Sequence, residues 1–216
     1  PFLQKVESES EGFSDEKIKL PEKMLSTDKA YTWGEIEKWL ERISKFSEEI
    51  NVQLSEIQIK GTAKLDGFAG YDDGKKLYTR GDGNKGSDIS RVFQRGLGIL
   101  NDSERGQGPG EIVVKRSYFE DHLSNDFEYP RNFQASLIKE KELDKFARDA
   151  IDAKAALFVP FKQLPFWKGN IDEFKNQFLD IVIKLEEGVD FDIDGVVFEI
   201  VNPELKEFMG SNRKFH

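Results

Sequence analysis

Lys64-Leu65-Asp66-Gly67 follows a short run in which apolar and polar residues alternate, and Asp72-Asp73-Gly74-Lys75 comes soon after it. An Asp-Gly pair between alternating segments is a strong signal for a β-hairpin. If Asp73-Gly74 is the two-residue turn, counting outward gives the register of the two strands. The expected pairs are Tyr71 with Lys76, Ala69 with Tyr78, and Gly67 with Arg80.

Polar side chains are expected to gather at one end of this hairpin. Lys64 and Asp66 are two residues apart, so on a strand they project from the same face. The register adds Arg80, whose guanidinium can bind two oxygen atoms at once. An amine, a carboxylate and a guanidinium in one place suit phosphate chemistry.

The pattern Lys-x-Asp-Gly resembles the nucleotidyltransferase signature of DNA ligases. The resemblance covers about residues 24–216, and it implies a domain that transfers AMP from NAD to Lys64, with Mg²⁺, as the first step in sealing nicked double-stranded DNA. Five further segments resemble the adenylation domain of NAD-dependent DNA ligases, in the family's order and at roughly its spacing: Met24-Leu25-Ser26, residues 79–83 with Gly86, Gly110-Glu111, Pro130-Arg131-Asn132, and Ile193-Asp194-Gly195-Val196-Val197.

Length and composition suit one globular domain. The chain has 216 residues, of which 38% are hydrophobic and 34% are charged, enough to bury a sizeable core. Residues 1–23 are polar and charged, so we expect a linker or N-terminal arm there and the adenylation domain at 24–216. Strands and helices are mixed without a regular βαβ rhythm. This predicts an α+β fold with mainly antiparallel sheets flanked by helices.

The clearest helix signal is a capping box at Thr32 and Glu35, followed by apolar residues at helical spacing up to about residue 50. A second amphipathic helix is expected at 171–187. Shorter helices are expected at 87–97, at 117–123 and after Pro203, and residues 131–153 are expected to be largely helical. Strands are expected at 111–114, 157–161 and 191–201, and Pro160 argues for an edge strand.

Composition also excludes some kinds of site. A chain without cysteine forms no disulfide and no thiolate zinc site. No apolar run is long enough to span a membrane and no signal peptide is evident, so we expect a cytoplasmic protein without a membrane partner. The formal charge of −9 means that any DNA contact is a local basic patch or comes from another module.

Lys64 is the expected nucleophile, whose amine would attack the α-phosphorus of a nucleotide and form a lysine–AMP intermediate. A lysine amine is protonated at neutral pH, so the site must favour the free amine through partial burial, nearby cations, or bound metal and phosphate. A solvated strand lysine is the alternative for an isolated residue, but Asp66 and Gly67 favour the nucleophile. Asp66 can hold the lysine, the ribose or a metal, and Gly67 lets the backbone approach a ligand closely.

The other nucleotide and metal ligands follow from the resemblance. Ser26 and Thr27 correspond to the adenine pocket, although a simple turn before a helix explains them as well. Glu111 corresponds to a ligand of ribose or of the metal, with an ordinary surface glutamate as the alternative. Asp194, expected on the same strand face as Asp192, corresponds to a Mg²⁺ ligand, with a negatively charged sheet edge as the alternative.

Three basic residues are candidates for contact with DNA. Arg80 suits a phosphate of the nucleotide or of the nicked strand, but an ion pair with Asp66 or Asp82 would explain it nearly as well. Arg131 and Lys139 resemble the basic pair that contacts DNA phosphates in the family, although arginine is usual at the second position. A solvated helix face is the alternative for that pair.

The sequence departs from the family pattern at several positions. Glu199 stands where an active-site lysine is usual, and like charges near phosphates repel. Thr62 stands where a glutamate helps to recognise adenine. Glu186 and Pro109 replace arginines, and Lys214 comes too early to be the family's last catalytic lysine.

These departures leave two alternatives to an NAD-dependent DNA ligase domain. One is an enzyme on the same fold that uses ATP. The other is a degenerate ligase-like domain that binds nucleotide or DNA without catalysis. The expected partners are nicked double-stranded DNA and the missing ligase domains or a second subunit, because the usual NMN-recognising region is not evident in residues 1–23.

Overall fold

A computed structural model describes residues 17–24, 28–139 and 142–211, and its strands form three sheets. Every strand pair is antiparallel except β6 with β8, so the expected α+β fold with mainly antiparallel sheets is confirmed. The three-stranded sheet has the order β10-β2-β9: Ile193–Ile200, Gln58–Leu65 and Phe166–Asn170. The five-stranded sheet has the order β4-β3-β7-β8-β6: Leu77–Thr79, Phe68–Asp72, Gly108–Val114, Ala156–Pro160 and Gly98–Ile99. The third sheet pairs β1, Ile18–Lys19, with β5, Lys85–Gly86.

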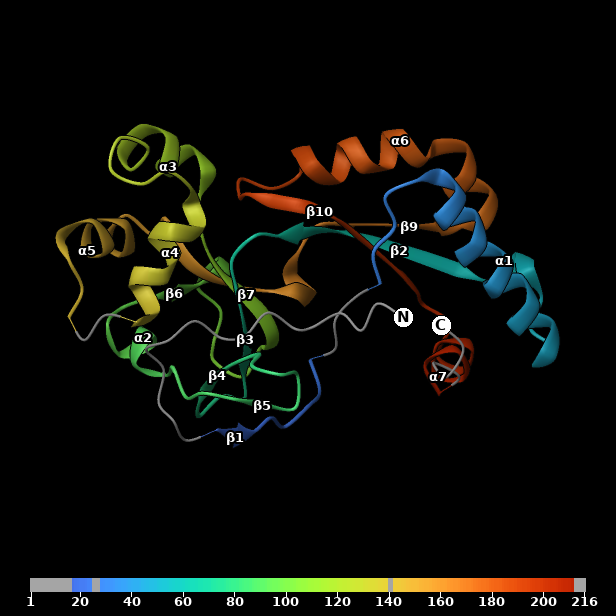
Figure 1. The fold of residues 1–216 in the computed structure, drawn as a ribbon, viewed down its shortest axis with the longest axis horizontal. Coiled ribbons are helices and arrows are strands. Elements are labelled where there is room, and N and C mark those ends of the chain that lie inside the picture. Colours follow the sequence, from blue (N-terminus) through green and yellow to red (C-terminus); the bar gives the residue numbers. More distant parts are fainter. Residues whose placement is uncertain (1–16, 25–27, 140–141, 212–216) are drawn as a thin grey trace.

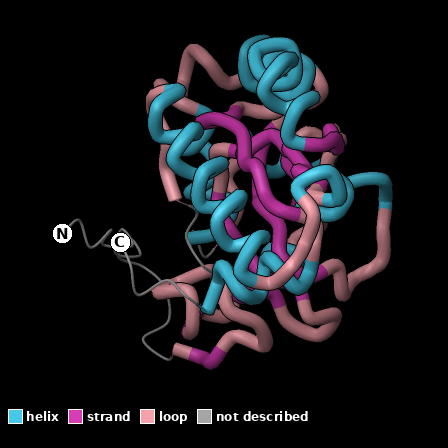
Figure 2. The backbone as a smooth tube through the Cα atoms, turned by 90° about the vertical axis from the view of Figure 1, so that its right-hand side faces the viewer, coloured by secondary structure: helices cyan, strands magenta, loops and turns pink. Residues whose placement is uncertain are grey.

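Helices lie on the outer sides of most of the strands, which run through the middle of the molecule (Figure 2). Beside the three-stranded sheet lie α1, Trp33–Glu49, α6, Ile171–Glu187, and α7, Pro203–Ser211 (Figure 1). Beside the five-stranded sheet lie α2, Arg91–Gln94, α3, Arg116–His122, α4, Pro130–Lys139, and α5, Lys145–Asp152. Short 3₁₀ turns occupy Leu54–Glu56, Leu100–Asp102 and Phe161–Gln163.

The two long helices begin as the sequence predicts. The Thr32 hydroxyl accepts a hydrogen bond from the Glu35 backbone, and the Glu35 carboxylate accepts one from the Thr32 backbone at 3.0 Å, so the capping box is confirmed. The apolar side of α1 packs with α6 and α7 against the three-stranded sheet, in a core that includes Ile43 and Phe174. Asn170 caps α6 in the same manner.

The chain passes from one main sheet to the other at Lys64-Leu65-Asp66-Gly67. β2 belongs to the three-stranded sheet and ends at Leu65, whereas β3 belongs to the five-stranded sheet and begins at Phe68. Leu65 is buried in a small core that also holds Val113 of β7 and Phe191. The residues that the sequence singles out therefore lie where the two sheets meet.

The expected hairpin register is wrong by two residues. Tyr71 pairs with Tyr78, and the backbone of Arg80 donates to Ala69 at 3.1 Å. The turn is closed by a hydrogen bond from the Asp73 N–H to the Lys76 carbonyl, which makes Gly74 and Lys75 the central residues. Gly74 alone of these residues has a positive φ, of 92°, whereas a type I′ turn centred on Asp73-Gly74 needs positive φ at both.

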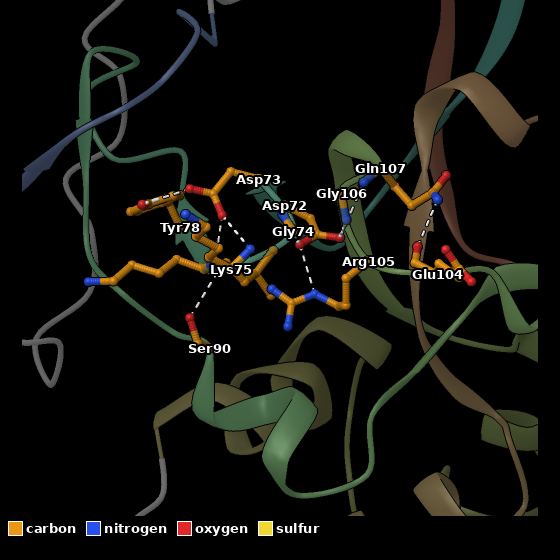
Figure 3. A network of polar contacts seen from close by, with 12 residues as sticks. Asp72, Asp73, Gly74, Lys75, Tyr78, Ser90, Glu104, Arg105, Gly106 and Gln107 are labelled. Carbon is orange, nitrogen blue, oxygen red and sulfur yellow. Dashed lines mark hydrogen bonds and ion pairs between the residues drawn. The ribbon is translucent and has the colours of Figure 1, made fainter.

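Buried Asp72 ties the hairpin turn to the loop before β7 (Figure 3). Its carboxylate accepts hydrogen bonds from the side chain of Arg105 at 2.8 Å and from the backbone of Gly74 at 3.1 Å. The backbones of Gly106 and Gln107 donate to its second oxygen. The Arg105 guanidinium also lies 4.0 Å from the centre of the Phe93 ring. The buried charge is thus fully compensated, as burial requires.

Several other expected bounds differ. The helix expected at 87–97 is reduced to α2, because Asp88 and Ser90 form a local turn before it. The segment 131–153, expected to be largely helical, forms the two helices α4 and α5. β8 is at the edge of the sheet only locally, at Pro160, because β6 pairs with Leu157 and Phe158 of β8 and does not extend to Pro160. No strand was expected at 166–170, where β9 pairs with β2.

Candidate active site

Lys64 lies on β2 at the junction of the sheets and forms an ion pair with Asp194. Its Nζ is 2.6 Å from Oδ1 and 2.5 Å from Oδ2 of that residue. Ile193 pairs with Leu65 and Gly195 pairs with Lys64, so Asp194 is the extra residue of a β-bulge. A bulge redirects a side chain. Here it interrupts the regular strand that was expected to place Asp192 and Asp194 on the same face.

Asp66 follows β2 and is held from two directions. Its backbone N–H donates to the Asp192 carbonyl at 2.9 Å, and its carboxylate contacts the guanidinium of Arg131 at 3.2 Å. Arg131 comes from the first turn of α4 and also lies over the ring of Phe68 at 5.9 Å. The described contacts therefore place Arg131 beside Asp66, where the hairpin register predicts Arg80.

Glu111 is a buried carboxyl in this group, with 8% of its surface exposed. Burial raises its pKa to about 8, although Lys64, the backbone N–H of Gly67 and Arg131 oppose this shift. A carboxyl with such a pKa is mostly protonated at neutral pH. Glu111 lies on β7, the strand next to β3, and pairs there with Ala69.

Gly67 is required here by packing. A Cβ at this position would lie 2.3 Å from the carbonyl oxygen of Ile112 and 2.7 Å from a side-chain carbon of Val113. A larger residue would push β3 away from β7 and would disturb the N–H that contacts Glu111. The prediction that Gly67 also lets a ligand approach closely stays a prediction.

Gln134 is a site residue that sequence reasoning missed. It lies on α4, one helical turn after Arg131, and is fully buried. With its amide oriented to satisfy both neighbours, it donates to the Asp66 carbonyl and accepts from the backbone N–H of Val114, each at 3.2 Å. The available signal was its position three residues after Arg131, on a helix face otherwise lined by buried residues.

The remaining expected ligands are less closely grouped. Ser26 and Thr27 lie outside the described residues, as does the side chain of Lys139. Within the described residues, Arg80 has no ion pair with Asp66, which contacts Arg131, or with Asp82, which accepts from the backbone of Asn84 and Lys85. The alternative of such an ion pair is therefore wrong.

The three carboxylates expected to bind metal do not form one cluster. Across the described part of the chain, no three carboxylate or imidazole side chains are grouped closely enough to hold a metal ion. Asp194 contacts Lys64, Asp66 contacts Arg131, and Glu111 is buried and favours its protonated form. Mg²⁺ needs only one or two carboxylates when phosphate oxygens and water complete its shell, so Asp66 and Asp194 fit this role better than Glu111.

Comparison with known proteins shows the family of the chain. A family model described as the NAD-dependent DNA ligase adenylation domain matches residues 13–155. The chain belongs to this family. The match includes Lys64, Asp66, Glu111 and Arg131, and Asp194 lies beyond it.

Relatives match the adenylation domain over nearly all of its length. A DNA ligase of Ruthia magnifica subsp. Calyptogena magnifica is 61% identical over 98% of the chain, and one of Vesicomyosocius okutanii subsp. Calyptogena okutanii is 60% identical over all of it. A DNA ligase of Shewanella baltica is 49% identical, again over all of the chain. In each case the chain spans about a third of the relative's length: 34%, 34% and 33%.

Glu199 of this adenylation domain does not carry an uncompensated charge. It lies on β10 directly opposite Lys60 of β2, and the two side chains are 3.8 Å apart. Lys206 of α7 forms a second ion pair with it. The expected repulsion of phosphates by Glu199 is therefore offset by two lysines.

No helix in the described part of the adenylation domain is both long enough and apolar enough to cross a membrane.

Proposed function

We propose that this chain is the adenylating part of a DNA ligase and that Lys64 accepts AMP from NAD as the first step of sealing nicked double-stranded DNA. The observation that carries the proposal is the contact of Lys64 with Asp194, in a chain that belongs to the adenylation-domain family. We take residues 24–216 as the domain and residues 1–23 as an arm. Within this arm, Ile18–Lys19 forms strand β1 and pairs with β5.

In the proposed step, the Lys64 amine attacks the α-phosphorus of the donor. A nitrogen–phosphorus bond forms, and the bond from that phosphorus to the bridging oxygen breaks, so nicotinamide mononucleotide leaves. The ammonium must first lose a proton, and Asp194 is the carboxylate in contact with it. A positioned proton acceptor of this kind contributes about 10²- to 10⁴-fold to a rate.

The neighbouring groups support the same chemistry. Arg131 can turn from Asp66 toward phosphate oxygens, which its guanidinium fork suits. Protonated Glu111 has a hydrogen to donate, for instance to a ribose hydroxyl, and cannot repel the donor. Gln134 and the Asp192 carbonyl hold the backbone of Asp66, so this residue is positioned before the donor binds.

Asp66 and Asp194 are the residues that would hold Mg²⁺. The ion would neutralise charge on the phosphate oxygens when bound. AMP would pass from Lys64 to the 5′-phosphate of a nick, and the 3′-hydroxyl would then displace it. Arg80, Arg131 and Lys139 are our proposed DNA contacts for that stage, together with domains or a second subunit that complete the ligase.

Ser26, Thr27 and Thr62 are our proposed contacts for the adenine of the donor. Thr62 and Glu199 also favour a second candidate function, a domain that binds nucleotide or DNA without chemistry, because both differ from the family pattern. If the domain is catalytic, ATP is the alternative donor of AMP.

The mass of the intact chain, measured before and after incubation with Mg²⁺ and either NAD or ATP, tests these proposals. We expect a gain of one AMP with NAD that is absent in Lys64→Ala. A gain with ATP alone would change the donor. No adduct with either donor, in this chain and in a longer one that includes the flanking sequence, would support the binding-only domain instead.

A further inference from the structure

One face of the three-stranded sheet is covered and the other is open. Along β2 the buried residues alternate with partly exposed ones, so Ile59, Ala63 and Leu65 face the cores while Lys60, Thr62 and Lys64 face outward. Residues paired across strands share a face. The outward face therefore includes three rows near Lys64: Lys64 with Gly195, Thr62 with Val197 and Phe166, and Lys60 with Glu199 and Lys168.

The row of Thr62 presents an exposed aromatic ring beside the nucleophile. Phe166 is 59% exposed, although its neighbour on β9, Trp167, packs against Phe174 on the covered face. Single exposed hydrophobic residues are common on protein surfaces. The informative feature of Phe166 is its place in the row adjacent to Lys64.

The surroundings leave room for a flat group over this ring. Thr62 is small, and Gly195 places no side chain beside Lys64; a Cβ built there would meet nothing within 4 Å. Lys60 borders the ring from the next row, with its ammonium 5.3 Å from the ring centre. Lys60 is held in turn by Glu199, so a cation lies near a ring that is 59% exposed.

The spacing fits a nucleotide attached at Lys64. Adjacent rows are separated by two residues of an extended strand, which is about 7 Å. One ribose bridges such a gap between a phosphate and its base. A base that lies one row from the Lys64 amine would be over Thr62 and in contact with Phe166.

We propose that Phe166 is the residue on which the base of the nucleotide donor stacks. The proposal rests on the proposed function, because it takes Lys64 as the site of the phosphate. Stacking on an aromatic side chain supplies affinity for any base, since every base has a π-face. Phe166 would thus provide binding that Thr62 cannot.

Binding of AMP and of ribose 5-phosphate to the intact chain, measured by calorimetry, tests this. We expect wild type to bind AMP more tightly than ribose 5-phosphate. Phe166→Ala should weaken AMP binding by roughly five- to a hundredfold and leave ribose 5-phosphate unchanged, whereas Phe166→Trp should keep AMP affinity. Leu179→Ala, at a 72% exposed position on the outer side of α6, is the matched control and should change neither.

Two results would overturn the proposal: AMP bound no better than ribose 5-phosphate by wild type, or AMP bound equally well by Phe166→Ala. Intact mass after incubation with NAD or ATP separates this inference from the proposed function. AMP binding that depends on Phe166 without any Lys64 adduct would remove the adenylation proposal alone. Adduct formation with the same donor dependence in Phe166→Ala would remove the stacking proposal alone.

Discussion

The Nζ of Lys64 lies 2.6 Å from Oδ1 of Asp194, a residue 130 positions later in the chain. The pair forms because β10 lies beside β2 and a bulge at Asp194 breaks the strand alternation there. The contact therefore both holds Lys64 and provides an acceptor for its proton.

Asp194→Asn should slow formation of the lysine–AMP adduct by about 10²- to 10⁴-fold, because an amide cannot accept the proton of Lys64. Adduct formation followed over time by intact mass measures this. Asp192→Asn is the matched control, since Asp192 contributes its backbone carbonyl to the site, and it should react nearly as fast as wild type. Equal rates for wild type and Asp194→Asn would exclude Asp194 as the proton acceptor.

The pKa of Glu111, near 8 in the folded protein against 4.5 for an ordinary glutamate, predicts a pH-dependent stability. Between these values the folded state binds a proton that the unfolded state has lost, so stability falls as pH rises, by about 1.4 kcal/mol per pH unit. Glu111→Gln lacks this titration. From pH 5.5 to 7.5, the variant should gain about 2 to 3 kcal/mol relative to wild type.

Urea unfolding of both proteins at the two pH values, with EDTA present, measures that difference. The comparison between variants cancels the other titrating groups. A difference in stability that does not change with pH would show that Glu111 titrates normally.

Gln134→Ala should reduce the free energy of unfolding by about 2 kcal/mol or more, because the Asp66 carbonyl and the Val114 N–H lose a buried partner. It should also slow adduct formation, since Asp66 loses a support. Gln177→Ala, at an exposed position on α6, is the control for stability. If Gln134→Ala lost stability but kept the wild-type adduct rate, the role of Gln134 at the site would be structural only.

Two aspartates test the value of burial for an ion pair. Asp72–Arg105 and Asp102–Lys154 have the same 2.8 Å separation, but the Asp72 side chain is fully buried and the Asp102 side chain is 76% exposed. Asp72→Asn should cost about 2 to 4 kcal/mol, less than a fully buried pair because Arg105 is partly exposed. Asp102→Asn should cost less than about 1 kcal/mol.

Thermal or urea unfolding of the two variants makes this comparison directly. Asp72 joins the hairpin turn to the loop that includes Arg105 (Figure 3), so proteolysis within residues 100–107 should also become faster in Asp72→Asn. Equal losses of stability for the two variants would contradict this account.

Local sequence sufficed for elements whose cause is local. The capping box at Thr32 and the apolar spacing after it predicted α1, and a continuous amphipathic pattern predicted α6 to the residue. The hairpin was also recognisable, but its register was not. The turn is centred on Gly74-Lys75, where the Asp73 carboxylate accepts hydrogen bonds from the backbones of Lys75 and Lys76, and Asp72 beside it bonds the distant Arg105 loop.

The candidate site also has features that local sequence indicates and features that depend on distant contacts. Sequence predicts Lys64, Asp66, Gly67, Glu111 and Asp194 as site residues, because each belongs to a short segment that resembles the family. Which of them touch was decided by tertiary structure: Arg131 instead of Arg80 beside Asp66, Gln134 beneath them, and Phe166 on a strand that no local pattern indicated. Sequence determines the chemistry that is present, since that is carried by single side chains. Only the packing of sheet on sheet and helix on sheet determines contacts, because these join residues far apart in the chain.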